Sequence, residues 1–375
     1  MKAVFTCGGT GGHINPALAV ARVLLERRPD SEILFVGAED GMEATLVPRE
    51  GFRLETLQIS SYMRSLKPSA IRHNVRAALS IRRALKKADR IIRDFQPDVI
   101  LGTGGYASYP MLHEGARLGI PTAVHESNAV PGLATKMVAD KVDRILVSFA
   151  DSRSAYRDPS RVIAVGMPVR EEFVFTRRAD ARRALGLDEK TPMIVSAWGS
   201  LGAREMNKKI AQFMKCECED NTPFHHIHAT GSFGWRWMPD YVREQGVDLA
   251  AQPRIEMREY IYDMPQVLAA ADLIICRAGA ATIAEVCASG TPCIMVPSPN
   301  VTGNHQEKNA RVLERSGAAA VVREADCDGK SLYETAKSIL SDAGRMRAMR
   351  ASARDMAVVD AAERIYQTAL DLAKH

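Results

Sequence analysis

Short apolar runs of strand length alternate with segments of helix length, and this rhythm constrains the fold more than any other feature of the chain. In its first half the apolar runs are 3–5, 33–36, 99–101, 122–124 and 145–147, with amphipathic stretches between them. Strands that alternate with helices form βαβ units, whose strands lie parallel in a helix-covered sheet. The first half therefore predicts an α/β fold with a parallel sheet.

The same rhythm restarts after Gly166, which indicates a second domain of the same kind. Its strands are predicted at 193–197, 227–229, 273–276 and 294–296, and its helices near 203–215, 281–288 and 304–315. A chain of 375 residues also exceeds what one core usually supports. Gly and Pro interrupt the periodicity at 165–168, so we predict domains at 1–165 and 166–345. The remainder, 346–375, is predicted to be helical and to pack across the junction.

The composition is that of a water-soluble globular protein. Hydrophobic residues make up 46% and charged residues 25% of the chain, and its seven cysteines form no C-x-x-C pair. The apolar run at the N-terminus is shorter than a signal peptide requires, and no run has the length of a membrane span. We therefore expect free thiols in a reducing cytosol.

Positive charge is concentrated in one segment. Residues 61–95 hold ten Lys and Arg against two Asp, which leaves a net charge of about −3 on the rest of a chain whose total is +5. Apolar residues between these cations follow a roughly helical stripe, as in a helix that lies on an anionic membrane. The predicted membrane contacts are Arg72, Arg76, Leu79, Arg82, Arg83 and Lys86. No nucleic-acid-binding motif accompanies the segment, so we expect no nucleic-acid partner.

Three glycine-rich turns each follow a predicted strand. They are Gly8-Gly-Thr-Gly-Gly-His13, Gly102-Thr-Gly-Gly-Tyr106 and Gly199-Ser-Leu-Gly202. Missing side chains let a ligand approach the backbone, and the helix that follows attracts anionic groups. The first turn is not a dinucleotide fingerprint, because Ile14 stands where its third glycine belongs, which disfavours a dehydrogenase. Each turn alone is compatible with a simple tight turn, whereas the three together favour a nucleotide-sugar site.

An ordered series of motifs carries a family resemblance. The series is Gly8 to His13, Gly104-Gly-Tyr106, His125-Glu126, Asn128, Pro168-Val-Arg170, Gly199-Ser200, Gly202-Ala203, Arg277-Ala-Gly-Ala280, Glu285, His305-Gln306 and Asn309-Ala310. With it, residues 2–365 resemble the N-acetylglucosaminyltransferases that make lipid II, usually called MurG. The resemblance implies the GT-B fold, in which two Rossmann-like domains face each other across a cleft.

The resemblance implies an inverting transfer of N-acetylglucosamine from UDP-GlcNAc to the 4-hydroxyl of the MurNAc of lipid I, giving lipid II. The expected location is the cytoplasmic face of the cell membrane, where the protein would be peripheral, with cell-wall or division machinery as a further candidate partner. Two alternatives remain open: a UDP-N-acetylglucosamine 2-epimerase-like isomerase, and a non-catalytic relative that binds nucleotide sugars.

Roles for individual residues also follow from the resemblance. The base is His13 or Glu126, and Thr10, Gly11, Gly12 and Tyr106 line the acceptor and donor-sugar side. Glu285 is expected to accept hydrogen bonds from the ribose hydroxyls, and Ile261 to bind the uracil. Ala281 and Thr282, with Ser200 and Arg170, are expected to bind the diphosphate. The sugar is read by Gln306, His305 and Asn128. The remaining expected substrate contacts are Ala280, Ile283, Ala284 and Asn309.

No metal or other cofactor is expected. Asp326-Cys-Asp328 matches the letters of a metal-binding Asp-x-Asp motif, but it lies far from the donor motifs, and Asp328 suits a helix cap. His226 and His228 share one side of a predicted strand, yet no acidic or Cys partner is evident, so we interpret them as structural. A helix N-terminus and Arg170 would offset the leaving-group charge.

Five positions depart from the family pattern. They are Ser127, Thr135, Met167, Trp198 and Leu201. Trp198 matters most, because an indole beside the phosphate turn must either swing out or fill volume that the donor needs. An active enzyme is expected, because six other motif positions are intact: His13, Asn128, Arg170, Ser200, Glu285 and Gln306.

Overall fold

The structure, a computed structural model, describes residues 1–59 and 68–374, and for 68–79 it describes the backbone only. The chain divides into two compact units. Unit 1 comprises 1–169 and 360–375, and unit 2 comprises 170–359. The boundary therefore falls four residues after the predicted position. The predicted terminal segment is not a separate part, because its helices are divided between the two units.

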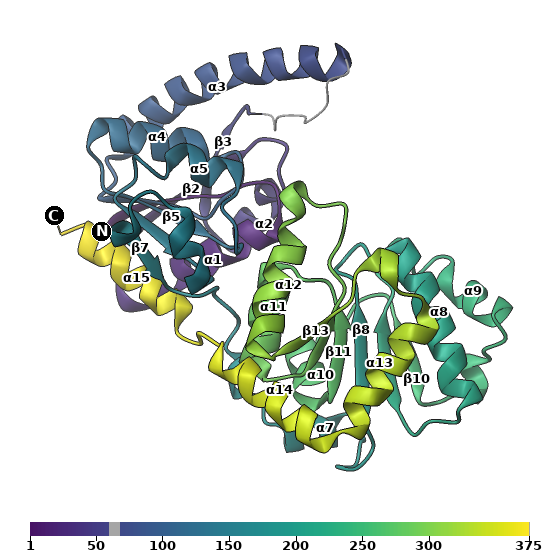
Figure 1. Ribbon diagram of the computed structural model, residues 1–375. Helices are drawn as coiled ribbons and strands as arrows, with labels where there is room; N and C mark the ends of the chain where they lie inside the picture. The colour runs from purple at the N-terminus through teal and green to yellow at the C-terminus, as the bar shows by residue number, and fades with distance from the viewer. Residues whose placement is uncertain (60–67, 375) are drawn as a thin grey trace. The chain divides into compact units, whose positions relative to one another are not determined.

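Unit 1 is a parallel sheet with the strand order β3-β2-β1-β4-β5-β6-β7 (Figure 1). Its elements are β1 (Lys2–Thr6), α1 (Gly11–Arg27), β2 (Glu32–Ala38), α2 (Glu43–Arg49), β3 (Arg53–Leu57), α3 (Pro68–Phe95), β4 (Val99–Gly102), α4 (Ser108–Leu118), β5 (Thr122–Glu126), α5 (Leu133–Val138), β6 (Arg144–Val147), β7 (Val162–Ala164) and α15 (Ala361–Leu372). Short 3₁₀ turns occupy Ala150–Ala155 and Pro159–Arg161.

Successive strand residues in unit 1 point to opposite faces of its sheet, and each face has its own core. Phe5 and Leu101 pack with α1, α2 and α15, whereas Val4 and Ile100 pack with α3, α4 and α5. This alternation is the period of two that a pleated strand imposes. Because both faces are covered by helices, the central strands contain continuous apolar stretches such as 3–5 and 99–101, as expected for a parallel sheet.

Unit 2 repeats the architecture with the strand order β10-β9-β8-β11-β12-β13. Its elements are α6 (Glu172–Phe175), α7 (Arg178–Ala184), β8 (Met193–Ala197), α8 (Arg204–Glu219), β9 (His225–Ala229), α9 (Met238–Glu244), the 3₁₀ turn η3 (Leu249–Ala251), β10 (Ile255–Arg258), α10 (Met264–Ala270), β11 (Leu273–Cys276), α11 (Ala280–Ser289), β12 (Cys293–Met295), η4 (Thr302–Asn304), α12 (His305–Ser316), β13 (Ala319–Val321), η5 (Glu324–Asp326), α13 (Gly329–Ser341) and α14 (Ala343–Asp355). Helices α8, α9, α13 and α14 contribute to one large core on the sheet.

Each sheet has one point at which the direction of strand addition reverses. In unit 1 it lies between β1 and β4, and in unit 2 between β8 and β11. Loops that leave the carboxyl ends of the two strands at such a point diverge, and the opening between them is where α/β sheets bind ligands. The glycine turns at 8–13 and 102–106 flank the first switch point. The turn at 199–202 and the 277–280 loop flank the second.

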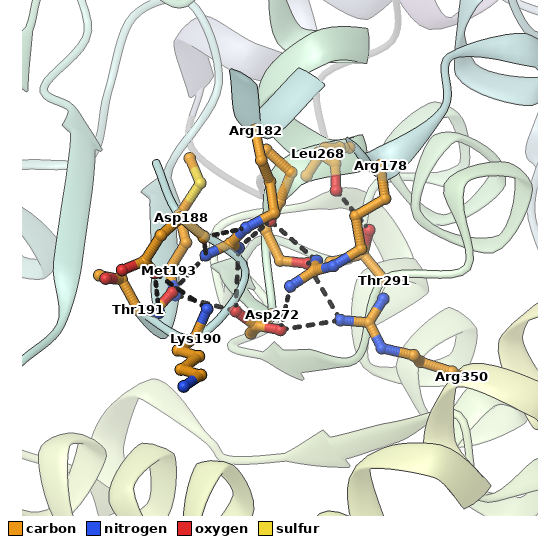
Figure 2. A network of polar contacts seen from close by, with 12 residues as sticks. Arg178, Arg182, Asp188, Lys190, Thr191, Met193, Leu268, Asp272, Thr291 and Arg350 are labelled. Carbon is orange, nitrogen blue, oxygen red and sulfur yellow. Dashed lines mark hydrogen bonds and ion pairs between the residues drawn. The ribbon is translucent and has the colours of Figure 1, made fainter. Parts of the chain in front are cut away.

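The amino-terminal edge of the unit 2 sheet is held by a cluster of ion pairs around Asp272 (Figure 2). Its carboxylate pairs with Arg178 at 2.6 Å, with Arg350 at 3.1 Å and with Arg182 at 3.4 Å, and it accepts a hydrogen bond from the Met193 N–H. The Arg182 side chain is only 2% exposed. Burial, together with the neighbouring Arg178, lowers the pKa of Arg350 to about 10.

Asp272→Asn is expected to destabilise the protein by about 2 kcal/mol, because a neutral amide leaves the buried guanidinium of Arg182 without its counter-charge. The melting temperature should fall by about 5 °C. Asp240→Asn, which alters an exposed pair with Arg243, is the matched control and should leave the melting temperature unchanged. Equal melting temperatures for the two variants would contradict the role assigned to the cluster.

Candidate functional site

The two glycine turns of unit 1 lie in direct backbone contact at the first switch point. A Cβ atom built on Gly105 would lie 2.2 Å from the Gly8 carbonyl oxygen, and one built on Gly8 would lie 2.8 Å from the Ala107 Cβ. The Tyr106 ring lies beside Gly9. Only glycine allows this approach, so the sequence motif specifies how the two loops join.

His13 lies in the first turn of α1, at the junction of these loops. Its Nδ1 is 3.0 Å from the Thr103 carbonyl oxygen, and the Thr103 hydroxyl donates to the His13 carbonyl at 2.6 Å. Because a carbonyl only accepts, Nδ1 carries the proton and Nε2 carries the lone pair of the neutral ring. Gly104, at φ +99°, has no Cβ that would collide with the ring. The imidazole is thus held in the tautomer that has its lone pair on Nε2.

Glu43 supports the first glycine turn through a hydrogen bond that the sequence does not reveal. Its carboxylate is buried and accepts hydrogen bonds from the N–H groups of Gly9 at 3.1 Å and Ala38 at 2.7 Å. Burial, with Glu43 and Asp40 nearby, raises the pKa of Tyr106. The Gly9 contact joins residues 34 positions apart, which no local pattern reveals.

Glu126, the second candidate for the base, is buried and heavily hydrogen-bonded. Its oxygens accept from the backbone and side-chain N–H groups of Asn128, from the Gly132 N–H and, at 2.6 Å, from the Thr135 hydroxyl. Glu126 therefore organises the loop that carries Asn128. The departure at Thr135 is compatible with this arrangement, because its hydroxyl is one of the donors.

Two other departures from the family pattern in unit 1, Ser127 and Met167, are also buried. The Ser148 hydroxyl lies 3.8 Å from the Met167 sulfur. Nothing in the structure explains why serine stands at 127.

In unit 2, the residues at the turn after β8 differ in how exposed they are to solvent. Ser200 is exposed, as is Leu201 at 57%, whereas Trp198 is 4% exposed and belongs to the core of the unit. The indole therefore points away from the turn into the interior. The ring is therefore not swung out into solvent.

Helix α11 presents its first turn at the second switch point. Its N-cap is Gly279, which has no side chain to cap the amides of Ala281 and Thr282. Such amides and the helix dipole attract a phosphate. Arg170 is exposed and close enough to Glu285 to influence its ionisation. The first turn of α11 thus has no side-chain cap and lies on the same helix as a carboxyl that Arg170 influences.

Glu285 lies one turn further along α11 and is half-buried. Burial raises the pKa of its carboxyl to about 7, and the positive charge of Arg170 only partly offsets this effect. A carboxylate kept at such a desolvation cost is typical of a functional site. The other substrate contacts expected on this helix are Ala280, Ile283 and Ala284, of which Ile283 is buried and the other two are partly exposed.

The remaining expected donor contacts lie on the other loops of this edge. Gln306 accepts a hydrogen bond from the Ser298 N–H at 2.9 Å, and His305 begins α12, as its position in the sequence indicates. Ile261 is buried in the loop before α10. Asn309 is completely buried, and its amide donates to the Ala278 carbonyl, so it supports the loop before α11.

The two motifs that resemble metal-binding sites form hydrogen bonds with other residues of the protein. Asp328 caps α13 by accepting from the Ser331 N–H, which confirms its interpretation as a cap. The histidines of β9 are linked through Ser196, and His226 Nδ1 pairs with Glu217 at 2.8 Å. Glu217, on α8, is thus an acidic partner that was not evident from the sequence. Burial lowers the pKa of His228 to about 3.

The basic helix α3 is partly described. Arg82, Arg83 and Lys86 are exposed, while Ala88 and Ile92 are buried in the unit 1 core. In this half, apolar residues predicted to face a membrane therefore pack on the sheet instead. The side chains of Arg72, Arg76 and Leu79 lie outside the described residues. In the part of the chain that the structure describes, no helix is both long and apolar enough to cross a membrane.

Comparison with known proteins matches both units to one family. Residues 3–147 match the glycosyltransferase family 28 N-terminal domain, and residues 193–365 match its C-terminal domain. The UDP-N-acetylglucosamine–N-acetylmuramyl-(pentapeptide) pyrophosphoryl-undecaprenol N-acetylglucosamine transferase of Acetivibrio thermocellus is 40% identical over 100% of this chain and 99% of its own. The transferase of the same name from Listeria welshimeri is 37% identical over the full length of both chains.

Solved structures agree with this result. Acinetobacter baumannii MurG superimposes with a TM-score of 0.79 at 26% identity and covers 99% of both chains. A UDP-N-acetylglucosamine 2-epimerase from Listeria monocytogenes reaches a TM-score of 0.67 over 97% of this chain and 94% of its own, but at 14% identity it shares the fold alone. The two Rossmann-like units thus have the GT-B architecture, and the chain belongs to the MurG family within glycosyltransferase family 28.

Proposed function

We propose that the protein transfers N-acetylglucosamine from UDP-GlcNAc to the MurNAc 4-hydroxyl of lipid I and so forms lipid II. The observation that carries the proposal is the full-length likeness to transferases whose names state this reaction. The acceptor oxygen attacks the anomeric carbon, the bond from that carbon to the diphosphate breaks, and UDP departs. The hydroxyl proton goes to a base on the protein.

We assign the base to Nε2 of His13. Its Nδ1–H contact with Thr103 leaves that nitrogen as the acceptor of the neutral ring, and imidazole titrates near neutral pH. Glu126 is assigned a positioning role, because its oxygens already hold the Asn128 loop. Thr10, Gly11, Gly12 and Tyr106 would line the acceptor side around this residue.

On the donor side, Glu285 would accept hydrogen bonds from the ribose hydroxyls, and Ile261 would bind the uracil through its backbone. The amides of Ala281 and Thr282, with Ser200 and Arg170, would bind the diphosphate. A carboxylate that accepts from two hydroxyls gains strong, charge-assisted hydrogen bonds. Gln306, His305 and Asn128 would read the sugar.

We further propose that the transfer needs no metal ion, since the α11 N-terminus and Arg170 supply positive charge to the departing diphosphate. Enzyme dialysed against EDTA should retain its rate to within about twofold, because preorganised donors of this kind need no further cation. The measurement is UDP release in Chelex-treated buffer. Loss of activity that Mg²⁺ or Mn²⁺ restores would contradict this proposal.

The exposed cations of α3 support peripheral binding to an anionic membrane surface at its cytoplasmic face. Replacing Arg82 and Arg83 by Gln should weaken binding to phosphatidylglycerol vesicles about 25-fold, because each cation near such a surface contributes about 1 kcal/mol. Cosedimentation at fixed ionic strength measures this. Arg243→Gln in unit 2 is the control, and equal losses in both variants would point to non-specific attraction.

The reaction itself is tested with purified protein, labelled UDP-GlcNAc and a lipid I analogue. Acceptor-dependent release of UDP together with a labelled disaccharide-lipid is the expected result. Formation of a free epimer without acceptor would instead identify an isomerase. Donor binding without any turnover would identify a non-catalytic relative.

A further inference from the structure

Arg277, in the loop between β11 and α11, is held on several sides within unit 2. Its guanidinium carbon lies 5.6 Å from the centre of the Trp198 ring, and its Nη1 donates to the Val296 carbonyl at 3.1 Å. The same nitrogen forms a 2.6 Å ion pair with Glu324. The side chains of Arg277 and Glu324 are only 13% and 17% exposed. One side chain thus ties the ends of β8, β11 and β12 to the η5 turn.

The Trp198 indole forms one wall of this arrangement. The ring is 4% exposed and packs in the core that includes Met206 and Val296. Its Nε1–H has no hydrogen-bond partner among the described residues. The N–H of a buried indole usually donates a hydrogen bond. Within the described part of the chain it does not, so a hydrogen bond is not the reason for tryptophan at this position. The aromatic face is what Trp198 contributes, because a cation over a partly desolvated ring is attracted to its quadrupole.

The loop held in this way ends at the first turn of α11. Arg277 precedes the N-cap Gly279 by two residues, and the Ala278 carbonyl between them accepts from the Asn309 amide. The direction of the Ala281 and Thr282 amides therefore depends on where this loop is fixed. A shift of the loop would misdirect donors that must converge on one anion.

We propose that Trp198 is a positioning residue for the donor site, acting through the cation–π contact with Arg277 to fix the loop that opens α11. The proposal rests on the proposed function, since it takes the α11 terminus as the diphosphate site. It also accounts for the departure at this position, where the family usually has glycine: the aromatic residue adds a support beneath Arg277 that glycine cannot provide.

Two substitutions distinguish the contribution of the aromatic ring face from that of apolar packing alone. Trp198→Leu keeps an apolar side chain but removes the ring, and it should raise the Kd for UDP about fivefold. Trp198→Phe keeps a ring face and should leave the Kd within about twofold. Because the α11 terminus is also proposed to offset the charge of the departing diphosphate, kcat at saturating UDP-GlcNAc should fall in Trp198→Leu, whereas Trp198→Phe should keep it within about twofold of the wild type. Isothermal titration calorimetry gives the Kd, and steady-state kinetics on the lipid I analogue give kcat.

Arg277→Gln completes a double-mutant cycle. In the Arg277→Gln background, Trp198→Leu should no longer change the Kd for UDP, because the pair that couples the ring to the loop is already broken. Equal Kd values for the wild type and Trp198→Leu, equal weakening by Leu and Phe, or a full effect of Trp198→Leu in the Arg277→Gln background would each overturn the proposal. If the wild-type protein bound no UDP at all, the proposed function itself would fail instead. Melting temperatures show whether each variant is folded at the assay temperature.

Discussion

His13→Gln is expected to lower kcat by about 10³-fold, a loss within the range that a positioned general base supplies. Glutamine keeps a polar side chain of similar length and can still donate to the Thr103 carbonyl, so the loop junction should survive. What disappears is the Nε2 lone pair that would accept the proton of the acceptor hydroxyl. Because donor binding is assigned to unit 2, the Kd for UDP should stay within about twofold of the wild type.

Single-turnover kinetics with the lipid I analogue, combined with calorimetric UDP binding, measure the two quantities separately. His113→Gln, the same chemical change on α4 where His113 packs edge-on against Tyr109, is the matched control and should leave both unchanged. Retention of kcat to within about tenfold would move the base elsewhere. A larger loss for Glu126→Gln than for His13→Gln would return that role to Glu126.

Glu285→Gln should raise the Kd for UDP about 100-fold, because an amide replaces two charge-assisted hydrogen bonds to the ribose with weaker ones. The same change should make the unliganded protein more stable at pH 8. The carboxyl pKa is raised by burial to about 7, so at pH 8 the folded protein carries a poorly solvated charge that the amide does not have. Loss of binding together with a higher melting temperature is the expected signature of this residue.

The pH dependence follows from the sign of this shift. Between the ordinary Glu pKa near 4.5 and the folded value near 7, the folded protein binds the proton more tightly than the unfolded chain does. This group's contribution to the free energy of unfolding is therefore present below pH 4.5 and is lost as the pH rises towards 7. Affinity for UDP should change in the opposite direction, rising with pH until the carboxyl is ionised.

Calorimetry in buffers of different ionisation enthalpy should detect protons released when UDP binds at pH 6. Thermal melts of the wild type and Glu285→Gln from pH 5 to 8 measure the stability side. Glu219→Gln, an exposed carboxylate at the end of α8 whose side chain is 62% exposed, is the control. Proton release of the same size in Glu285→Gln would assign the titration to another group.

The central strands of both sheets were predictable from the sequence, whereas the edge strands were not. All four edge strands, β3, β7, β10 and β13, are absent from the predicted set. A central strand of a parallel sheet is buried on both faces and so forms a continuous apolar run. The edge strands are only partly buried, as in β3 with a single buried residue and β10 with one. Charged residues interrupt β3 and β10, whereas β7 and β13 lie in the short apolar runs 162–165 and 318–322, which were missed.

In the candidate site, the sequence likewise revealed residues within short motifs but not residues that act through contacts distant in the chain. Glycine turns, helix starts and Glu285 lie in contiguous motifs, and their order along the chain identified the family. Glu43 and Glu217 do not, because each acts through a contact with a residue on another element, and the contact of Thr103 with His13, 90 positions away, is not visible in its motif. Trp198 was noticed as unusual, but which way its indole points depends on the core of unit 2, and that core is assembled from many separate segments.

The division of the chain has a consequence for the order in which the protein is made. Helix α15 completes the unit 1 core, where Ile365, Tyr366 and Ala369 are buried with α1, yet it is the last element of the chain. During synthesis the ribosome must produce all of unit 2 before unit 1 can close. Until then the nascent unit 1 exposes the apolar surface of α1 that α15 later covers, so it is the stage most dependent on protection from aggregation.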